Sequence, residues 1–275
     1  MPELPEVETV CRGLRRHILG ETIEHVRIYY PPVIHQKNMT VEAFKQQLCG
    51  QTIKAVERRG KYIVLVLDKG WLVCHLRMTG KLLVRPNFTE KEKHDLASFT
   101  LKSGKHLLYE DVRKFGGFFF TQENPYTTSS LEKLGPEPLS DAFNDRVLWT
   151  GSRNRRRPIK SHLLDQSVVA GIGNIYADEI LFRAEIRPRK STACLTKKEC
   201  RAIVCATKEV LQEAVEAGGS TIRDYVDAEN QQGSFQLSHR VYGRAGQQCY
   251  QCGSTLKSIT VGGRSSVYCP KCQKS

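Results

Sequence analysis

The sequence predicts an α+β protein of more than one domain, and three patterns predict it. Residues 5–19 have the periodicity of an amphipathic helix, and residues 22–121 contain about eight short β-type runs. Helical periodicity then follows residue 143 up to Gly218-Gly219, and two CxxC motifs lie near the end of the chain. A chain of 275 residues can form one to two domains with substantial cores. The 40% hydrophobic content excludes a disordered protein.

The first element is a helix from Pro5 to about Leu19, which Gly20 ends. Its apolar residues recur at steps of three and four along the chain: Val7, Val10, Cys11, Leu14 and Ile18.

The next hundred residues alternate short apolar runs with turn signals such as Asp68-Lys69-Gly70 and Ser103-Gly104. About eight strands at this spacing predict an antiparallel sandwich or barrel. The runs are TIEHVRIYY, QTIKAVERR, KYIVLVLD, WLVCHLRM, KLLV, ASFTLK, HLLYED and GGFFFT.

A domain boundary is expected at LGPEPLSDAF, residues 134–143, because two prolines and a glycine break both periodicities. Helices follow Pro158 and the tight turn GIGN at 171–174. A capping box of Thr196 and Glu199 predicts a long helix that stops at Gly218-Gly219.

The stretch 220–238 has weak periodicity and many polar residues, so it predicts a long loop of the kind that often carries function. The glycines of GIGN let backbone amides approach an oxyanion, and Asn174 stands at the N-terminus of the next helix. With the upstream cations they predict a phosphate clamp. The alternative is an ordinary glycine-containing helix connection. The cations are Arg153, Arg155, Arg156, Arg157 and Lys160.

Four of the ten cysteines form C-x2-C-x16-C-x2-C, which predicts one structural zinc site and no organic cofactor. The ligands are Cys249, Cys252, Cys269 and Cys272. The spacer between the pairs is typical of a hairpin that turns at Gly262-Gly263, with Arg264 beside the turn. Two chance CxxC pairs, or a redox pair, are the alternatives. The six other cysteines share no spacing and are expected to be reduced thiols.

The formal net charge is +13, and it is concentrated in three segments. Residues 1–133 carry 21 basic and 15 acidic side chains, residues 151–200 carry 11 and 5, and residues 238–275 carry 6 and none. Clustered positive charge suits a surface that follows phosphates, so a polyanion is the expected partner. A generally basic solvated surface is the alternative.

The N-terminus MPELPEVETV has no secretory signal, and no apolar run approaches the roughly 18 residues of a membrane span. We therefore expect a cytoplasmic protein that does not contact a membrane.

Pro2 is small enough for Met1 to be removed, which leaves a secondary amine. An α-amino group titrates near pH 7.7–8.0, roughly, so part of it is unprotonated at neutral pH. Such an amine can attack a sugar C1′ and form an iminium, while Glu3 and Glu6 are close enough to move protons. The alternative is an ordinary Met-Pro start with acidic residues in the first helical turn.

Eight stretches taken together, in order, resemble one family, the bacterial formamidopyrimidine-DNA glycosylases, also called 8-oxoguanine DNA glycosylase/AP lyases. The stretches are MPELPEVET, ERRGKY at 57–62, HLRMTG at 75–80, DVRKFG at 111–116, LGPEPL at 134–139, LLDQSVVAGIGNIYADE at 163–179, GGSTIRDY at 218–225 and VYGRAGQQCYQCG…GGRSSVYCPKCQ at the end. The resemblance covers the whole chain, with Ser266 where Thr is more usual.

The resemblance implies three domains. The first is an N-terminal antiparallel β-sandwich with the N-terminal helix, over residues 1–133. A helix–two-turns–helix domain over 134–237 follows and includes a lesion-capping loop at 220–237. A four-cysteine zinc finger over 238–275 ends the chain.

The resemblance also implies the chemistry. Pro2 is the expected Schiff-base nucleophile, Glu3 the general acid/base and Glu6 a further active-site carboxylate. Lys61 and Arg264 match proton donors of β- and δ-elimination. Because a Lys with a pKa near about 10.4 is a poor acid, we expect both to grip the phosphates that flank the lesion.

The family's intercalating residues match Met78, Arg113 and Phe115. Met78 is expected to fill the hole left by the flipped base, Arg113 to donate a hydrogen bond to the orphaned cytosine, and Phe115 to wedge into the adjacent base step. Further expected DNA contacts are His75, His94, Arg156, Asn174 and Tyr242. The backbone near the flipped base is expected to be that of Ser220, Thr221, Ile222, Arg223, Asp224 and Tyr225, whose amides can distinguish a protonated N7 from an acceptor N7.

The implied function is a monomeric glycosylase/AP lyase of base excision repair. It would act in the bacterial cytoplasm, at the nucleoid, on duplex DNA that contains an oxidised purine (8-oxoguanine, formamidopyrimidines) or an abasic site. An endonuclease VIII-type glycosylase for oxidised pyrimidines is the nearest alternative, and a non-enzymatic zinc-ribbon DNA-binding protein is another.

Overall fold

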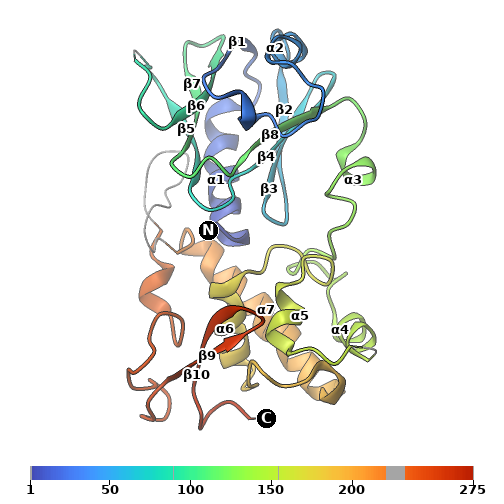
Figure 1. The fold of residues 1–275 in the computed structure, drawn as a ribbon, viewed down its shortest axis with the longest axis vertical. Coiled ribbons are helices and arrows are strands. Elements are labelled where there is room, and N and C mark those ends of the chain that lie inside the picture. Colours follow the sequence, from blue (N-terminus) through green and yellow to red (C-terminus); the bar gives the residue numbers. More distant parts are fainter. Residues whose placement is uncertain (1, 89, 154, 221–232, 275) are drawn as a thin grey trace. The chain divides into compact units, whose positions relative to one another are not determined.

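The computed structural model describes residues 2–88, 90–153, 155–220 and 233–274, drawn in Figure 1. Contacts between Cα atoms divide the chain into two compact units. Unit 1 is Met1–Glu132 with Ala217–Ser234, and unit 2 is Lys133–Glu216 with Phe235–Ser275. The expected boundaries instead kept 220–237 with the helical segment. Within the described part of that segment, Gly219 and Ser220 contact Glu6 of the first helix, and Ser234 is hydrogen-bonded to Ala217.

Unit 1 contains two four-stranded antiparallel sheets, with strand orders β1-β6-β7-β5 and β2-β3-β4-β8 (Figure 1). Two separate sheets confirm the sandwich and exclude the closed barrel. The strands are β1 (Ile23–Ile28), β2 (Ile53–Arg59), β3 (Tyr62–Leu67), β4 (Gly70–His75), β5 (Gly80–Arg85), β6 (Asp95–Leu101), β7 (His106–Asp111) and β8 (Gly117–Thr121).

The first helix, α1 (Leu4–Ile18), completes the core of unit 1. It contacts β2 and β3 of one sheet and β5 of the other. Its apolar stripe is at most 1% exposed and joins the strand side chains in one cluster. Gly20 follows with a φ of +79°, in the left-handed region that glycine tolerates.

Three short helical elements of unit 1 were absent from the sequence expectations: η1 (Pro31–Val33), α2 (Val41–Leu48) and α3 (Pro125–Thr128). The α2 helix is anchored by only two fully buried side chains, Phe44 and Leu48. Two apolar positions in eight residues are too few for a clear helical period. The cap is clearer, since the Thr40 side chain accepts a hydrogen bond from the Ala43 amide.

Unit 2 is helical up to a C-terminal hairpin. Its helices are α4 (Asp145–Ser152), α5 (Ile159–Leu164), α6 (Asn174–Arg183), η2 (Thr192–Cys194), α7 (Lys197–Glu216) and η3 (Phe235–Ser238). The capping box is confirmed, because Thr196 Oγ1 accepts the Glu199 amide at 3.1 Å and Glu199 accepts the Thr196 amide at 2.8 Å. The η3 turn lies inside the stretch that the sequence predicted as loop.

The α5 and α6 helices are joined by the two turns of residues 165–173. Asp165 accepts the Ser167 amide at 3.0 Å, and the Gln166 side chain accepts the Gly171 amide at 2.9 Å. Gly171 has a φ of +87°. This arrangement is a helix–two-turns–helix motif.

The hairpin consists of β9 (Lys257–Val261) and β10 (Arg264–Tyr268), and it turns at Gly262-Gly263 as predicted. In the part of the chain that the structure describes, no helix combines the length and the apolar character that a membrane crossing requires.

Candidate functional site

The N-terminal segment places two carboxylates beside Pro2. Pro2 is buried, and Glu3 and Glu6 are 2% and 1% exposed at the start of α1. Glu3 and Glu6 form a capping box, in which the Glu6 carboxylate accepts the Glu3 amide at 2.8 Å. Pro2 therefore stands at the N-terminal end of α1, next to both carboxylates.

The second oxygen of Glu6 connects this segment to residues that follow α7. It accepts the Ser220 amide at 2.7 Å, and Ser220 is itself buried. Gly219 lies against the same carboxylate, where a Cβ would come within 2.8 Å of Glu6 Oε1. The Ser234 amide donates to the Ala217 carbonyl at 3.0 Å, so residues 217–220 and 233–234 lie together. Thr221, Ile222, Arg223, Asp224 and Tyr225 lie outside the described residues.

Lys61 lies on the turn between β2 and β3, and His75 is the last residue of β4 in the same sheet. Lys61 follows the left-handed Gly60 and is only 8% exposed. The His75 ring meets Tyr62 edge-on at 4.5 Å, and its Nδ1 accepts the Arg77 amide at 2.9 Å. Burial, and next the charges of Arg77 and Lys61, lower the pKa of His75 to about 3. The ring is therefore neutral, and because Nδ1 accepts a hydrogen bond its proton is on Nε2. His75 can donate a hydrogen bond from Nε2 but carries no positive charge.

The three expected intercalating residues lie on two turns that touch each other. Met78 is 37% exposed on the β4–β5 turn, and Phe115 is 53% exposed on the β7–β8 turn. Arg113 is exposed, and its guanidinium lies 4.7 Å from the centre of the Phe115 ring. The Arg113 amide donates to the Thr79 hydroxyl at 3.2 Å, which links the turns. His94 is half-buried before β6.

In unit 2, Asn174 begins α6 directly after Gly173, and its Oδ1 has no hydrogen-bond partner among the described residues. Asn174 and Tyr242 line a cavity of about 260 Å³ that the hairpin residues Ser258 and Ser265 also line. The Tyr242 amide is fixed by Glu179, at 2.8 Å. Arg264 is exposed at the start of β10.

The arginine-rich run does not act as one clamp. The Arg153 guanidinium donates to the carbonyls of Thr192, Ala193 and Leu195 and lies 3.6 Å from the centre of the Trp149 ring. Lys160 is fully buried and pairs with Asp178 at 2.8 Å. The expectation that Arg153 and Lys160 bind phosphate is therefore wrong.

Of the other three arginines of the run, Arg155 and Arg156 are exposed and Arg157 is half-buried. Arg157 pairs with Asp165 at 2.8 Å and donates to the His162 ring. Arg155 lies 3.4 Å from the same carboxylate and is exposed. Arg156 is exposed as well, so it is the best placed of the run to contact phosphate.

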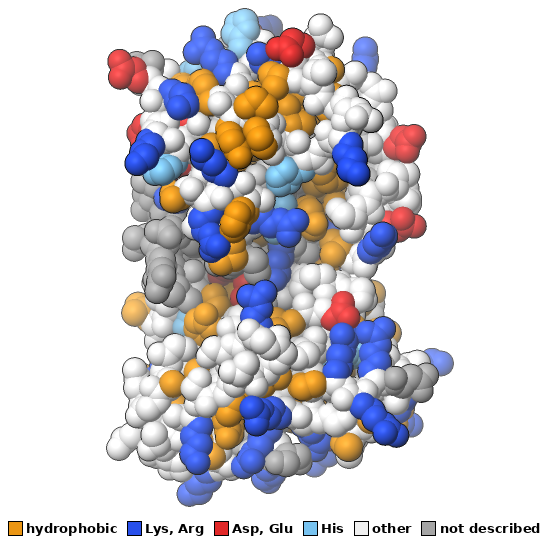
Figure 2. Space-filling model, in the orientation of Figure 1, with side chains coloured by type: hydrophobic (Ala, Val, Ile, Leu, Met, Phe, Trp, Pro, Cys, Tyr) orange, Lys and Arg blue, Asp and Glu red, His pale blue; other side chains and the backbone are white. Residues whose placement is uncertain are grey.

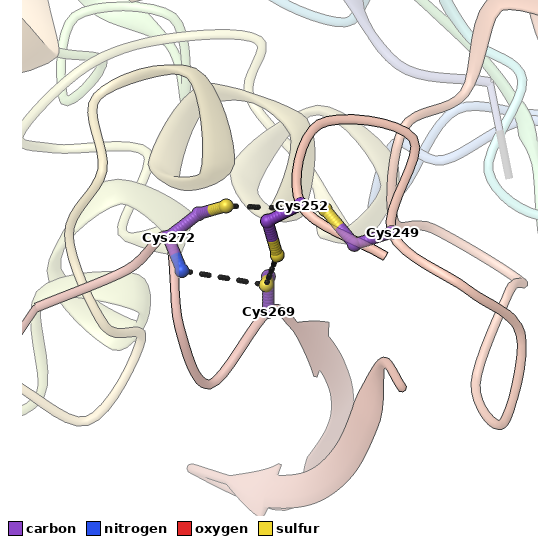
Figure 3. A group of neighbouring side chains, drawn as sticks. All are labelled: Cys249, Cys252, Cys269 and Cys272. Carbon is purple, nitrogen blue, oxygen red and sulfur yellow. Dashed lines mark hydrogen bonds between the residues drawn. The ribbon is translucent and has the colours of Figure 1, made fainter. Parts of the chain in front are cut away.

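The four paired cysteines converge at the end of unit 2, as Figure 3 shows. Their sulfur atoms all lie within 4.8 Å of one another, with 3.5 Å between Cys252 and Cys269 and 3.9 Å between Cys249 and Cys272. A tetrahedral zinc ion with Zn–S bonds of about 2.3 Å separates its sulfurs by about 3.8 Å. The group therefore fits one structural zinc ion, as predicted from the spacing.

Charge on the surface supports a polyanionic partner. On the face drawn in Figure 2, Lys and Arg side chains are the prevailing charged groups in each unit taken separately. Exposed hydrophobic side chains lie among them on this face.

Comparison with known proteins decides the family. Family models match residues 1–118 (formamidopyrimidine-DNA glycosylase N-terminal domain), 134–226 (the H2TH domain of the same enzymes) and 246–274 (a zinc finger found in FPG and IleRS). The chain is 46% identical over 275 residues to the formamidopyrimidine-DNA glycosylase of Carboxydothermus hydrogenoformans, and both chains are covered completely. The chain belongs to the formamidopyrimidine-DNA glycosylase family.

Further relatives agree with this assignment. The enzyme of Streptococcus pneumoniae (strain TIGR4) is 44% identical, with 100% of this chain and 99% of the relative covered. A mutant of the Lactococcus lactis FPG in complex with Fapy-dG-containing DNA superposes with a TM-score of 0.93 at 37% identity, with full coverage of both chains. The Lactococcus lactis Fpg complex with abasic-site DNA gives 0.92 at 36% identity, with 99% and 100% covered.

Family membership confirms the predicted fold and enzyme class. The protein is a DNA glycosylase with AP lyase activity, an enzyme of base excision repair.

Sequence reasoning missed the residues that hold this site in place. Asp111, Asp178 and Glu179 are buried carboxylates that bind backbone amides. Each lies inside a stretch already singled out, DVRKFG or GIGNIYADE. For Asp178 and Glu179 the available signal was their place in the apolar run NIYADEILF, because a buried charge requires partners. Asp111 stands among charged residues, where no such signal exists.

Proposed function

We propose that this chain excises oxidised purines from duplex DNA through a Schiff base on Pro2 and then cleaves the strand by β- and δ-elimination. The observation that carries the proposal is the placement of Pro2 at the N-terminus of α1 beside the buried carboxylates Glu3 and Glu6. Removal of Met1 supplies the secondary amine.

The chemistry follows from that placement. The lone pair of the Pro2 nitrogen attacks C1′ and the bond from C1′ to the nucleobase breaks, so the nucleobase leaves with its electron pair and takes up a proton. The nitrogen gives up its own proton, which restores its lone pair. Opening of the sugar ring then yields the iminium, with a proton delivered to the ring oxygen by Glu3. The iminium accepts the electrons released when a general base removes a 2′-proton, and the C3′–O bond breaks so that the 3′-phosphate leaves. Removal of the 4′-proton then lets the C5′–O bond break, and the 5′-phosphate leaves.

The remaining site residues are proposed to hold and open the duplex. Met78, Arg113 and Phe115 fill the space of the flipped nucleotide, because they project from adjacent turns as exposed groups. Ser220 and the residues 221–225 singled out in the sequence are proposed to recognise the flipped base. Phosphates are gripped by cations and by hydrogen-bond donors: Lys61, His75, His94, Arg156, Asn174, Tyr242 and Arg264.

The same reasoning extends to organisation and location. We infer three functional regions, over 1–133, 134–237 and 238–275, and one protein copy per lesion in the bacterial cytoplasm, at the nucleoid. Lesion-containing and abasic DNA in the complexes of the Lactococcus lactis relatives supports the proposed substrate.

An oxidised pyrimidine is a second candidate substrate, since one complex of the Lactococcus lactis enzyme contains DNA with such a base. Single-turnover rates on 8-oxoguanine opposite C and on thymine glycol opposite A decide between the two. We expect the purine to be excised faster, and a faster pyrimidine rate would reverse the assignment.

Borohydride trapping on 8-oxoguanine DNA tests the nucleophile, with an N-terminal mass measurement to verify that Met1 is absent. We expect wild-type protein and the exposed-carboxylate control Glu24→Gln to form a covalent adduct. Pro2→Gly should lose or greatly slow trapping, and Glu3→Gln should slow base release. An unimpaired Pro2→Gly variant, or no adduct from processed wild-type protein, would refute the proposed mechanism.

A further inference from the structure

The two turns that carry Met78, Arg113 and Phe115 adopt conformations that need support. Each turn contains a non-glycine residue in the left-handed region, Arg77 with a φ of +53° and Lys114 with a φ of +57°. Such residues cost on the order of 1 kcal/mol each and persist only where the surroundings fix them. Exposed side chains on the turns do not supply that constraint.

One buried carboxylate supplies it for both turns. Asp111, the last residue of β7, is 0% exposed. Its Oδ1 accepts the Thr79 hydroxyl at 2.5 Å and the Arg113 amide at 3.1 Å, and its Oδ2 accepts the amides of Phe115 and Gly116 at 2.9 Å each. Two of the three intercalating residues are therefore held by their own backbone amides, and the turn of the third is held through Thr79.

The space around the turns leaves little freedom for another arrangement. Gly80 and Gly116 lie on the hydroxyl of the buried Tyr109. A Cβ at Gly80 would come within 2.5 Å of that oxygen, and one at Gly116 would overlap it. Both turns are therefore closely packed against Tyr109, and their hydrogen bonds to Asp111 fix their conformation.

We propose that Asp111 is a positioning residue that preforms Met78, Arg113 and Phe115 as one unit, and that discrimination of the base opposite the lesion depends on it. This inference rests on the proposed intercalating role of the three residues. Asp111 touches none of the reacting atoms. It acts because a displacement of about 1 Å in a group that must enter the duplex can cost on the order of 100-fold in rate.

Asp111→Asn tests the inference. An amide keeps the shape but offers one acceptor oxygen in place of two, and its NH2 group would face backbone donors. We expect excision of 8-oxoguanine opposite C to fall about 10- to 100-fold. The ratio of rates opposite C and opposite A should fall toward that of Arg113→Ala. The control is Asp68→Asn, which changes an exposed carboxylate on the turn between β3 and β4. Asp68 also accepts a backbone amide, that of Thr52 at 2.6 Å, and this variant should keep the wild-type ratio.

A second readout does not need activity. Hydrogen exchange of the free protein should accelerate in peptides that cover 76–80 and 112–117 in Asp111→Asn, and not in Asp68→Asn. Failure of wild-type protein to trap or excise would refute the proposed function, whereas unchanged exchange in a folded Asp111→Asn would refute the positioning role alone. An unchanged C-to-A ratio would also overturn it.

Should Asp111→Asn fail to fold, Thr79→Val removes one hydroxyl of this network at nearly constant volume. We expect an intermediate loss of opposite-base discrimination in Thr79→Val and recovery in Thr79→Ser. Wild-type discrimination in Thr79→Val would then count against the inference.

Discussion

The buried ion pair of unit 2 gives the sharpest stability prediction. Lys160 and Asp178 are 0% and 1% exposed, and their charged atoms lie 2.8 Å apart. Asp178 also accepts the Ser266 hydroxyl at 2.6 Å and the Val267 amide at 3.0 Å, while Lys160 donates to the Ser265 carbonyl at 2.8 Å. The pair therefore joins α5 and α6 to β10.

Lys160→Met removes the ammonium group and leaves a buried carboxylate. Breaking a buried pair in this way costs about 3–5 kcal/mol. Because Asp178 keeps two hydrogen-bond donors, we expect the lower end, about 3 kcal/mol of unfolding free energy. In Lys160→Met/Asp178→Asn no charge remains buried, so the double variant should lose less than the sum of the two single variants.

The expected pH dependence has a definite sign. Burial raises the pKa of Asp178 even with Lys160 present, and removal of the cation raises it further. A carboxyl whose folded pKa exceeds its unfolded pKa binds more protons when folded, so stability is lost as the pH rises through the folded value. Lys160→Met should therefore be less destabilised, relative to wild type, in acid than at neutral pH.

Urea denaturation followed by tryptophan fluorescence measures the effect. The chain has two tryptophans, Trp71 in unit 1 and Trp149 in unit 2, so a Trp71→Phe background reports on unit 2. Lys190→Met is the matched control: Lys190 lies 2.7 Å from Glu199, but the two side chains are 13% and 25% exposed. We expect that loss to stay near 1 kcal/mol or below. Equal losses in Lys160→Met and Lys190→Met would refute the argument from burial.

Three further predictions follow from single features. The Glu6 carboxylate accepts the amides of Glu3 and Ser220, and Glu6→Gln leaves one acceptor oxygen for the two amides. Single-turnover excision should therefore slow on the order of 10-fold in Glu6→Gln and stay at the wild-type rate in Glu8→Gln. Equal excision rates in the two variants would contradict this expectation. Treatment with a thiol-reactive mercurial should release one zinc ion per chain, measured with a metallochromic dye, and should abolish DNA binding. The control Cys49→Ala should release the same amount of zinc. DNA binding retained by metal-free protein would contradict a structural role for the ion. Burial, then Arg157, lowers the pKa of His162 to about 4, so the unfolded state takes up the proton first and stability falls as the pH drops from about 6.5 to 4. His162→Gln should flatten that slope in urea titrations.

Patterns with a strong period or a fixed spacing were predictable. The eight strands, the α1 stripe, the Thr196–Glu199 cap and the four-cysteine module each depend on local chemistry, and the structure contains all of them. The α2 helix was not predictable, because only Phe44 and Leu48 are buried and a two-residue face has no measurable period.

Tertiary pairing accounts for the remaining differences. Charge alone placed Lys160 and Arg153 on a phosphate-binding surface. No local pattern in the sequence indicates that Lys160 forms a buried ion pair with Asp178, or that three backbone carbonyls accept hydrogen bonds from Arg153. The contact of Glu6 with Ser220 is equally invisible to a local pattern, since the partners are 214 positions apart.

That last separation has a consequence for the order in which the enzyme is made. Ribosomes add about 5–20 residues per second, so Ser220 follows Glu6 by roughly 10–40 s. During this interval the sandwich strands, α5 and α6 are already synthesised, whereas the Glu6 carboxylate lacks its Ser220 partner. During synthesis, the hydrogen bond from Ser220 to Glu6 can form only after residue 220 has been added, so the Pro2 segment reaches its complete set of contacts late. We therefore expect a nascent chain that ends before residue 220 to have a folded sandwich in which Glu6, beside the nucleophile Pro2, lacks its hydrogen bond from Ser220.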